Sequence, residues 1–180
     1  MAQTITDIYL QQQRKLHENP NYGIASLSFA PIVADVMRMN GCKSVSDYGA
    51  GKKRLLDGLR QLEIEPTPYM PYDPVFPEYG EPKSADLVCC IDVLEHIEPE
   101  CIDNVIQELE RITTNLGFFS IHMGPAGKTL TDGRNAHLIQ MPSSWWLKKL
   151  TDYFEILHLQ SHQTMGRGIW LIVTRKQDLK

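Results

Sequence analysis

Apolar residues are spaced along this chain in two patterns, one typical of helices and one typical of strands. Where they recur at three- and four-residue intervals, as Leu55, Leu59 and Leu62 do, they predict one face of a helix. Where they form a short run between polar residues, they predict a strand. The predicted helices cover residues 4–17, 26–39 and 52–62, a segment that starts at about Pro99, and one that Ser143 or Ser144 caps. The predicted strands cover residues 43–47, 68–72, 85–91, 117–123, 154–160 and 168–174.

The order of these elements predicts an α/β fold. Strands that alternate with helices form a parallel sheet, and the nearly unbroken apolar run 85–91 is typical of a strand covered on both faces. The last two strands follow each other without a helix, which predicts an antiparallel pair. We therefore expect a Rossmann-like, doubly wound sheet in a three-layer α/β/α sandwich, mostly parallel with an antiparallel C-terminal hairpin. Residues 1–180 form a single domain in this interpretation, with an N-terminal helical cap at 1–40 and an α/β core at 43–175.

Composition and charge narrow the function classes. A chain of 180 residues suits one domain, and its 42% hydrophobic and 22% charged content is ordinary for a globular protein. The formal net charge of −4 argues against a dominant nucleic-acid-binding surface. No signal peptide or membrane-length apolar stretch is apparent, and the four cysteines lack metal-type spacing. We expect a cytoplasmic protein with no membrane partner.

A strand, a glycine turn and a helix follow one another in the segment 45–56. The acidic residue Asp47 lies near the end of the strand, and Gly49 and Gly51 let backbone amides of the turn approach a ligand closely. This arrangement is typical of a nucleoside-cofactor pocket. A dinucleotide fingerprint continues to a third glycine, whereas this chain continues with Lys52, Lys53 and Arg54, so the turn by itself does not distinguish among cofactors.

Two motifs and the terminal hairpin together resemble class I S-adenosylmethionine-dependent methyltransferases over roughly residues 20–175. Residues 47–51, Asp-Tyr-Gly-Ala-Gly, are similar to the first motif of that family. Residues 92–97, Asp-Val-Leu-Glu-His-Ile, are similar to the motif that follows its fourth strand. The resemblance implies S-adenosyl-L-methionine as the cofactor and S-adenosyl-L-homocysteine as its product.

The resemblance also implies roles for individual residues in cofactor binding. Gly49 and Gly51 would pass beneath the methionine portion, and Asp47 would orient the turn or meet the amino group. Asp73 would bind the ribose, because a carboxylate can accept hydrogen bonds from two adjacent hydroxyls. The segment 74–84 is too short to contain the third strand that helps this family hold adenine, so that strand is expected to be absent or vestigial.

Three further residues are candidates for the cofactor pocket. Asp92 follows the apolar strand at its carboxyl end, where open α/β sheets place their ligand crevice. Tyr22 and Gly23, just before the second helix, either close over the cofactor or form an ordinary packing turn.

Glu95, His96 and His137 are the candidate catalytic residues. Glu95 and His96 lie just beyond the central strand, and an imidazole has a pKa suited to proton abstraction near neutrality. His137 lies in the loop after strand 117–123, a usual place for acceptor contacts in the resembled fold. The alternatives are that Glu95 or His96 braces the following helix and that His137 bonds to backbone. His122, inside a strand, is expected to be a core histidine.

Two histidines and a carboxylate can also hold a divalent metal. Glu95, His96 and His137 resemble the arrangement in small-RNA 3′-terminal 2′-O-methyltransferases. The chain departs from that pattern, because it has Asp92 in place of the first glutamate and one histidine in the later segment. We therefore predict a site without metal.

The function predicted from the sequence is transfer of a methyl group from S-adenosylmethionine to an oxygen or nitrogen of a small metabolite or saccharide. The first alternative is a catalytically silent S-adenosylmethionine-binding domain that serves as an interaction partner. A metal-assisted RNA 2′-O-methyltransferase is the second. A nicotinamide-dependent oxidoreductase agrees with the glycine turn but not with the closing hairpin.

Overall fold

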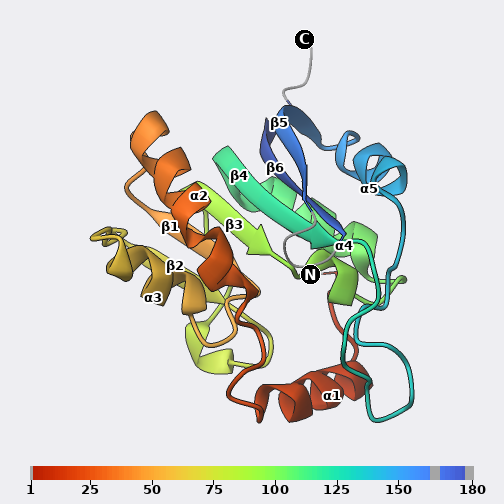
Figure 1. Cartoon of the computed structure of the whole chain (residues 1–180). Helices are drawn as coiled ribbons and strands as arrows, with labels where there is room; N and C mark the ends of the chain where they lie inside the picture. Colours follow the sequence, from red (N-terminus) through yellow and green to blue (C-terminus); the bar gives the residue numbers. More distant parts are fainter. Residues whose placement is uncertain (1, 163–166, 177–180) are drawn as a thin grey trace.

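The computed structural model describes residues 2–162 and 167–176, and it contains one six-stranded sheet with the strand order β2-β1-β3-β4-β6-β5 (Figure 1). The first four strands pair in parallel, and β6 runs antiparallel to both of its neighbours. The mostly parallel sheet and its antiparallel C-terminal hairpin are therefore confirmed. The strands are β1 (Val45–Tyr48), β2 (Tyr69–Tyr72), β3 (Ala85–Ile91), β4 (Thr113–His122), β5 (Phe154–His162) and β6 (Gly168–Arg175).

Helices cover both faces of the sheet and produce the predicted three layers. The helices are α1 (Asp7–His17), α2 (Ala25–Asn40), α3 (Arg54–Gln61), α4 (Ile102–Ile112) and α5 (Ser143–Leu150). Phe29 and Val33 of α2 and Leu59 of α3 pack with Leu87 of β3 in one buried cluster. Side chains of α4 and α5 pack on the opposite face, in a second cluster that contains Val88 of β3 and Trp146. Alternate residues of β3 thus enter different cores, which explains its continuous apolar run.

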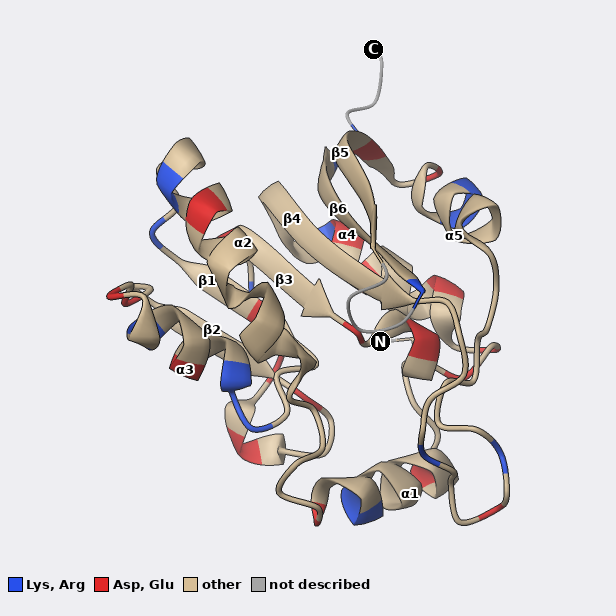
Figure 2. Ribbon diagram, viewed as in Figure 1, with Lys and Arg blue, Asp and Glu red and all other residues tan. Residues whose placement is uncertain are grey.

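Helix α1 belongs to neither of these layers. It lies beyond the carboxyl ends of the strands, apart from the helices that cover the sheet (Figure 1). Tyr9 on α1 packs against Leu130 and Ala136 of the long segment between β4 and α5, in a small cluster of its own. Basic and acidic residues are interspersed over the helices, with no continuous basic band across the described part of the chain in this view (Figure 2).

The structure corrects three local predictions. The helix after β3 begins at Ile102, not at Pro99, because residues 99–101 first form a turn in which the Cys101 amide donates to the Glu98 carbonyl at 2.8 Å. Neither predicted serine caps α5, whose N-cap is Pro142 without a side-chain hydrogen bond. Helix α1 begins at Asp7 instead of residue 4, since Thr6 accepts a hydrogen bond from the Tyr9 amide and caps it.

Two connections between strands were also predicted from the sequence, one between β2 and β3 and one between β5 and β6. The segment 74–84 contains only the 3-10 turn Pro77–Tyr79, so the third strand of the resembled family is indeed missing here. The predicted connection 161–167 between the last two strands includes residues 163–166, which lie outside the described residues.

Candidate functional site

A cavity of about 490 Å³ opens where β1, β2 and β3 end. The chain leaves β1 toward β2 on one side and returns to β3 on the other, so the cavity lies at the switch in strand order that α/β sheets use for ligands. His96 and His137 line it, whereas Glu95 is fully buried and is not among the lining residues. Every residue predicted to contact the cofactor also lines it: Tyr22, Gly23, Asp47, Gly49, Gly51, Asp73 and Asp92.

The glycine turn between β1 and α3 is shaped for close approach. Gly49 has φ +77°, and a Cβ placed there would lie 2.4 Å from Cγ2 of Val93. Only glycine fits at this position without a shift of its neighbour. The amides of Gly49 and Ala50 donate to the Tyr72 carbonyl at 2.8 and 2.9 Å, which joins the turn to the end of β2. Lys53, two residues after Gly51, also has a positive φ of 58°.

Two buried carboxylates lie beside this turn. Asp47 is 3% exposed and accepts a hydrogen bond from the Tyr69 hydroxyl, and burial raises the pKa of its carboxyl to about 7. Asp73 accepts from the amides of Gly51 and Val75, both at 2.9 Å. Burial also raises the pKa of Asp73, although these two hydrogen bonds oppose the rise. The pair provides acceptors for a cationic or hydroxylated ligand.

Asp92 is held in an uncommon backbone conformation at the end of β3. Its φ is 52°, which costs a non-glycine residue roughly 1–2 kcal/mol. Ser120 on the neighbouring strand fixes it twice, because its hydroxyl donates to the Asp92 carboxylate at 2.6 Å and its carbonyl accepts from the Asp92 amide at 3.1 Å. Strain of this kind persists where surrounding structure over-determines it, as at ligand sites.

Glu95, His96 and His137 come together although they are far apart in the sequence. One ring nitrogen of each histidine and one carboxylate oxygen of Glu95 lie within 4.8 Å of one another. Glu95 accepts from the backbone amide of His122 at 2.8 Å with Oε1, while Oε2 is buried without a hydrogen-bond partner. Burial, together with Asp92, raises the pKa of the Glu95 carboxyl well above its usual value.

Backbone carbonyls fix the proton positions on both imidazoles. Nδ1 of His96 lies 2.8 Å from the Ala136 carbonyl, and Nδ1 of His137 lies 2.7 Å from the Gly124 carbonyl. A carbonyl can only accept, so each Nδ1 carries the proton and each Nε2 keeps its lone pair. Burial and the neighbouring His137 lower the pKa of His96 to about 3, and burial also lowers the pKa of His137. Both rings are therefore neutral at physiological pH, with Nε2 free to accept a proton or bind a cation.

Helix α1 forms one wall of the cavity and reaches the glycine turn at its C-terminal end, where a Cβ on Gly51 would lie 3.2 Å from Cε1 of His17. Tyr9, Gln13 and His17 of α1 line the cavity together with Tyr22. The His17 ring meets the Tyr22 ring edge-on at 4.9 Å, and burial and Lys52 lower the pKa of His17 to about 4. The sequence pattern predicts no role for α1 beyond a cap, because its many polar residues are typical of an exposed helix.

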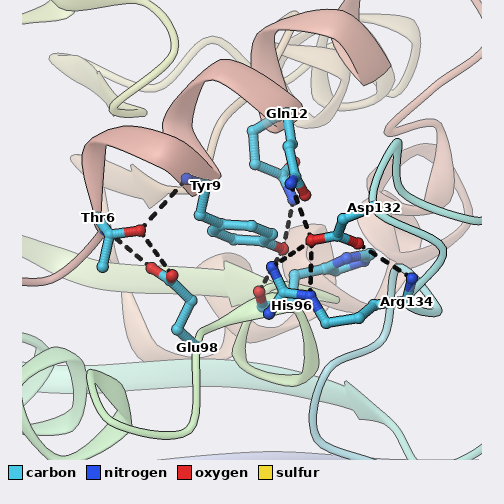
Figure 3. A network of polar contacts seen from close by, with 8 residues as sticks. Thr6, Tyr9, Gln12, His96, Glu98, Asp132 and Arg134 are labelled. Carbon is cyan, nitrogen blue, oxygen red and sulfur yellow. Dashed lines mark hydrogen bonds and ion pairs between the residues drawn. The ribbon is translucent and has the colours of Figure 1, made fainter.

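Polar contacts fasten α1 on both sides of the cavity (Figure 3). The amide and hydroxyl of Thr6 donate to Glu98 at 2.8 and 2.7 Å. The Tyr9 hydroxyl donates to the His96 carbonyl at 2.5 Å, on the turn that carries two of the candidate catalytic residues. Gln12 donates to Asp132 at 2.9 Å, in the loop that leads to His137.

The prediction for His122 is wrong. It lies at the last position of β4, where it is half-buried and lines the cavity instead of the core. Its ring centroid is 4.8 Å from that of His137. The signal in the sequence was its position near the carboxyl end of a parallel strand, where ligand-binding residues gather.

Comparisons with solved structures place this architecture among known folds. The chain is similar to magnesium protoporphyrin IX methyltransferase from Synechocystis PCC 6803, with TM-score 0.62, 17% identity and 94% and 95% of the two chains covered. It is also similar to 1,6-didemethyltoxoflavin-N1-methyltransferase from Burkholderia thailandensis, with TM-score 0.66, 13% identity and 99% and 93% covered. Both structures hold S-adenosylhomocysteine. The chain has the class I methyltransferase fold.

A third solved structure with this methyltransferase fold is the methyltransferase domain of bacterial CtHen1. The TM-score is 0.57 and the identity 15%, and the match covers 82% of this chain and 99% of that domain. No family model matches the sequence, and no curated protein matches it. Among the described residues, no helix has the length and apolar character needed to cross a membrane.

Proposed function

We propose that this protein transfers a methyl group from S-adenosylmethionine to an oxygen or nitrogen of a small metabolite or saccharide. The observation that carries the proposal is the convergence of the glycine turn and two buried carboxylates on one cavity at the carboxyl ends of β1 and β2. The resemblance of the fold to methyltransferases solved with S-adenosylhomocysteine supports it.

The residues around the turn fit the chemical groups of this cofactor. S-adenosylmethionine supplies an electrophilic methyl group on a positively charged sulfur. Asp47, with a pKa of about 7, would ionise on meeting the ammonium group. Asp73 retains lone pairs after accepting from two amides, so it can also accept from ribose hydroxyls. A Cβ at Gly49 would overlap Val93, so the backbone there stays close to the cavity.

His137 is the proposed proton acceptor for a hydroxyl acceptor group, and His96, whose pKa is lowered to about 3 by burial and by His137, is the weaker base of the two. Their Nδ1–H groups are bound to carbonyls, so each ring can take a second proton only at Nε2. The Tyr9 hydroxyl holds the His96 carbonyl and so fixes the turn that positions this ring. Glu95 supports the same turn from behind through the His122 amide, which favours a positioning role for it over a direct catalytic one.

Isothermal titration calorimetry with S-adenosylmethionine and S-adenosylhomocysteine tests this proposal. We expect both to bind, and Asp73→Asn to weaken binding by roughly ten- to 150-fold, since one charge-assisted hydrogen bond contributes roughly 1.5–3 kcal/mol. Asp35→Asn is the matched control, because Asp35 is an exposed residue on α2 that pairs only with Arg38. If neither compound binds, the proposal is refuted. Binding without transfer to any acceptor in a broad screen would support the catalytically silent alternative.

A second candidate function is metal-assisted 2′-O-methylation of RNA. The observation that favours it is the cluster of Glu95, His96 and His137, which has a partnerless buried carboxylate oxygen and two imidazoles with free Nε2 atoms. Neither Nε2 carries a proton, so a divalent cation could bind to both rings and to Glu95, where it would displace the proton that burial favours on this carboxyl. The expectation of a metal-free site stays a prediction.

Calorimetric titration of the protein with Mn²⁺ decides between the candidates. The second candidate predicts Mn²⁺ binding that His137→Ala abolishes, together with methyl transfer to a short RNA that a chelator stops. His158→Ala is the control, because this histidine stacks on Trp170 in the C-terminal hairpin. No Mn²⁺ binding, or binding that survives His137→Ala, would remove the metal-assisted candidate.

A further inference from the structure

His122 and His137 both form hydrogen bonds with the backbone of Gly124, in the loop that follows β4. Nδ1 of His137 lies 2.7 Å from the Gly124 carbonyl, and the Gly124 amide lies 3.1 Å from Nδ1 of His122. The two rings are 4.8 Å apart, and both line the cavity. One glycine therefore contacts both imidazoles through its two backbone polar groups.

These contacts give the two rings opposite tautomers. A carbonyl accepts, so Nδ1 of His137 carries a proton and its Nε2 is a bare lone pair. An amide donates, so Nδ1 of His122 must be a lone pair and its proton lies on Nε2. The reverse tautomer of His122 would set an N–H against the Gly124 N–H and leave that amide without an acceptor. The Gly124 carbonyl lies slightly farther from Nδ1 of His122, at 3.2 Å, and already accepts from His137 at 2.7 Å, whereas the Gly124 amide has this Nδ1 as its acceptor.

We propose that His122 and His137 form a donor–acceptor pair for two adjacent oxygens, so that the methyl acceptor is a vicinal diol. This inference rests on the proposed methyltransferase function and assigns its acceptor class. His122 donates its Nε2–H to one oxygen, and His137 accepts the proton of the neighbouring hydroxyl at Nε2. A simple amine could supply the proton for His137 but has no adjacent oxygen for His122.

The transfer step balances with this pair. The hydroxyl oxygen facing His137 forms the new bond to the methyl carbon, and the bond between that carbon and sulfur breaks with its electron pair left on sulfur. The hydroxyl proton passes to Nε2 of His137, whose Nδ1–H stays bound to the Gly124 carbonyl and stabilises the cation that forms. His122 holds the second oxygen throughout and is a binding residue that exchanges no proton.

Nitrogen-15 NMR of histidine-labelled protein saturated with S-adenosylhomocysteine tests the tautomers first. We expect the resonances of His122 to show a protonated Nε2 and those of His137 a protonated Nδ1, each assigned by its loss in a single-residue variant. A protonated Nδ1 in His122 would overturn the inference whatever else is found.

The same samples then test the acceptor class. Methyl β-D-ribofuranoside and methyl α-D-mannopyranoside each carry adjacent hydroxyls, and the 2-deoxy form of the riboside lacks one of them. We expect at least one of the two diols to bind, about three- to tenfold more tightly than the deoxy compound, which corresponds to one hydrogen bond. Preference for the riboside would indicate a nucleoside or RNA terminus, and preference for the mannoside a hexose.

Two substitutions at one position separate the donor role from packing. His122→Gln keeps an N–H donor and should retain diol binding, whereas His122→Leu removes the donor and should lose the discrimination between the diol and the deoxy compound. Calorimetry with S-adenosylhomocysteine shows that each variant is folded. Equal binding of diol and deoxy compound, or unchanged discrimination in His122→Leu, would overturn the inference while cofactor binding stands. Loss of S-adenosylhomocysteine binding in the unmodified protein would instead refute the proposed function, and this inference with it.

Discussion

Gly49→Ala is the sharpest test of the glycine turn. The substitution adds a methyl group 2.4 Å from Cγ2 of Val93, at a residue whose φ is +77°. A left-handed conformation costs a non-glycine residue roughly 1–2 kcal/mol, and forcing a methyl group into a packed position costs roughly 1–3 kcal/mol more. The free energy of unfolding should therefore fall by roughly 2–5 kcal/mol.

Gly41→Ala is the matched control for this substitution. Gly41 ends α2 with φ 65° and has no neighbour within 4 Å of an added Cβ, so it carries the conformational cost without the overlap. Its unfolding free energy should fall by roughly 1–2 kcal/mol. The entropy that a glycine contributes to the unfolded chain is the same in both variants, so their difference isolates the contact with Val93.

Thermal unfolding followed by circular dichroism measures both variants. For a chain of this length, 1 kcal/mol shifts Tm by about 2–4 °C, so Gly49→Ala should lose roughly 4–20 °C and Gly41→Ala roughly 2–8 °C. Affinity for S-adenosylhomocysteine should fall only in Gly49→Ala, because Gly41 is not among the residues that line the cavity. Equal Tm values for the two variants would show that Val93 moves aside, and the steric reasoning would then be wrong.

Three other predictions follow from buried polar groups and close packing. Burial raises the pKa of Asp47 to about 7, so its carboxyl keeps its proton in the folded state, whereas the unfolded state loses this proton from about pH 4. The free energy of unfolding should therefore fall as pH rises from about 4 to 7. Urea titrations across this range should show this fall in the unmodified protein and a flatter profile in Asp47→Asn. Tyr9→Phe leaves the part-buried His96 carbonyl and the Gln13 side-chain amide without their hydrogen-bond partner, and it should lower the free energy of unfolding by roughly 1–3 kcal/mol. The control Tyr153→Phe, whose hydroxyl bonds to an exposed partner, should lower it by less than about 0.5 kcal/mol. Equal losses in urea titrations of the two variants would contradict this prediction. Gly58→Ala places a methyl group 2.5 Å from the Ala30 Cβ between α2 and α3 and should cost roughly 1–3 kcal/mol, so a variant that unfolds with an unchanged midpoint would show that the two helices separate freely.

Local sequence patterns predicted the sheet because each pattern depends on neighbouring residues alone. The run 85–91 is apolar throughout, since β3 is covered on both faces, and the last two strands lack a helix between them. The helix boundary that was predicted wrongly, at the start of α4, lies next to a segment that contacts residues distant in the sequence. Residues 94–96 form a 3-10 turn before α4, and the Ile139 amide donates to the Glu95 carbonyl within it.

The sequence by itself determined the strand-turn-helix unit, the missing third strand and the glycines and carboxylates that line the cavity, because glycine, proline and acidic residues act through local backbone chemistry. Only the tertiary structure decided which ring nitrogen of each histidine is free. That choice depends on the carbonyls of Gly124 and Ala136 and on the Gly124 amide. Every residue has such backbone groups, so a sequence pattern does not show which of them will face a given imidazole. The role of α1 was decided in the same way, since contacts with Glu98 and Asp132, distant in sequence, turn a polar helix into a wall of the cavity.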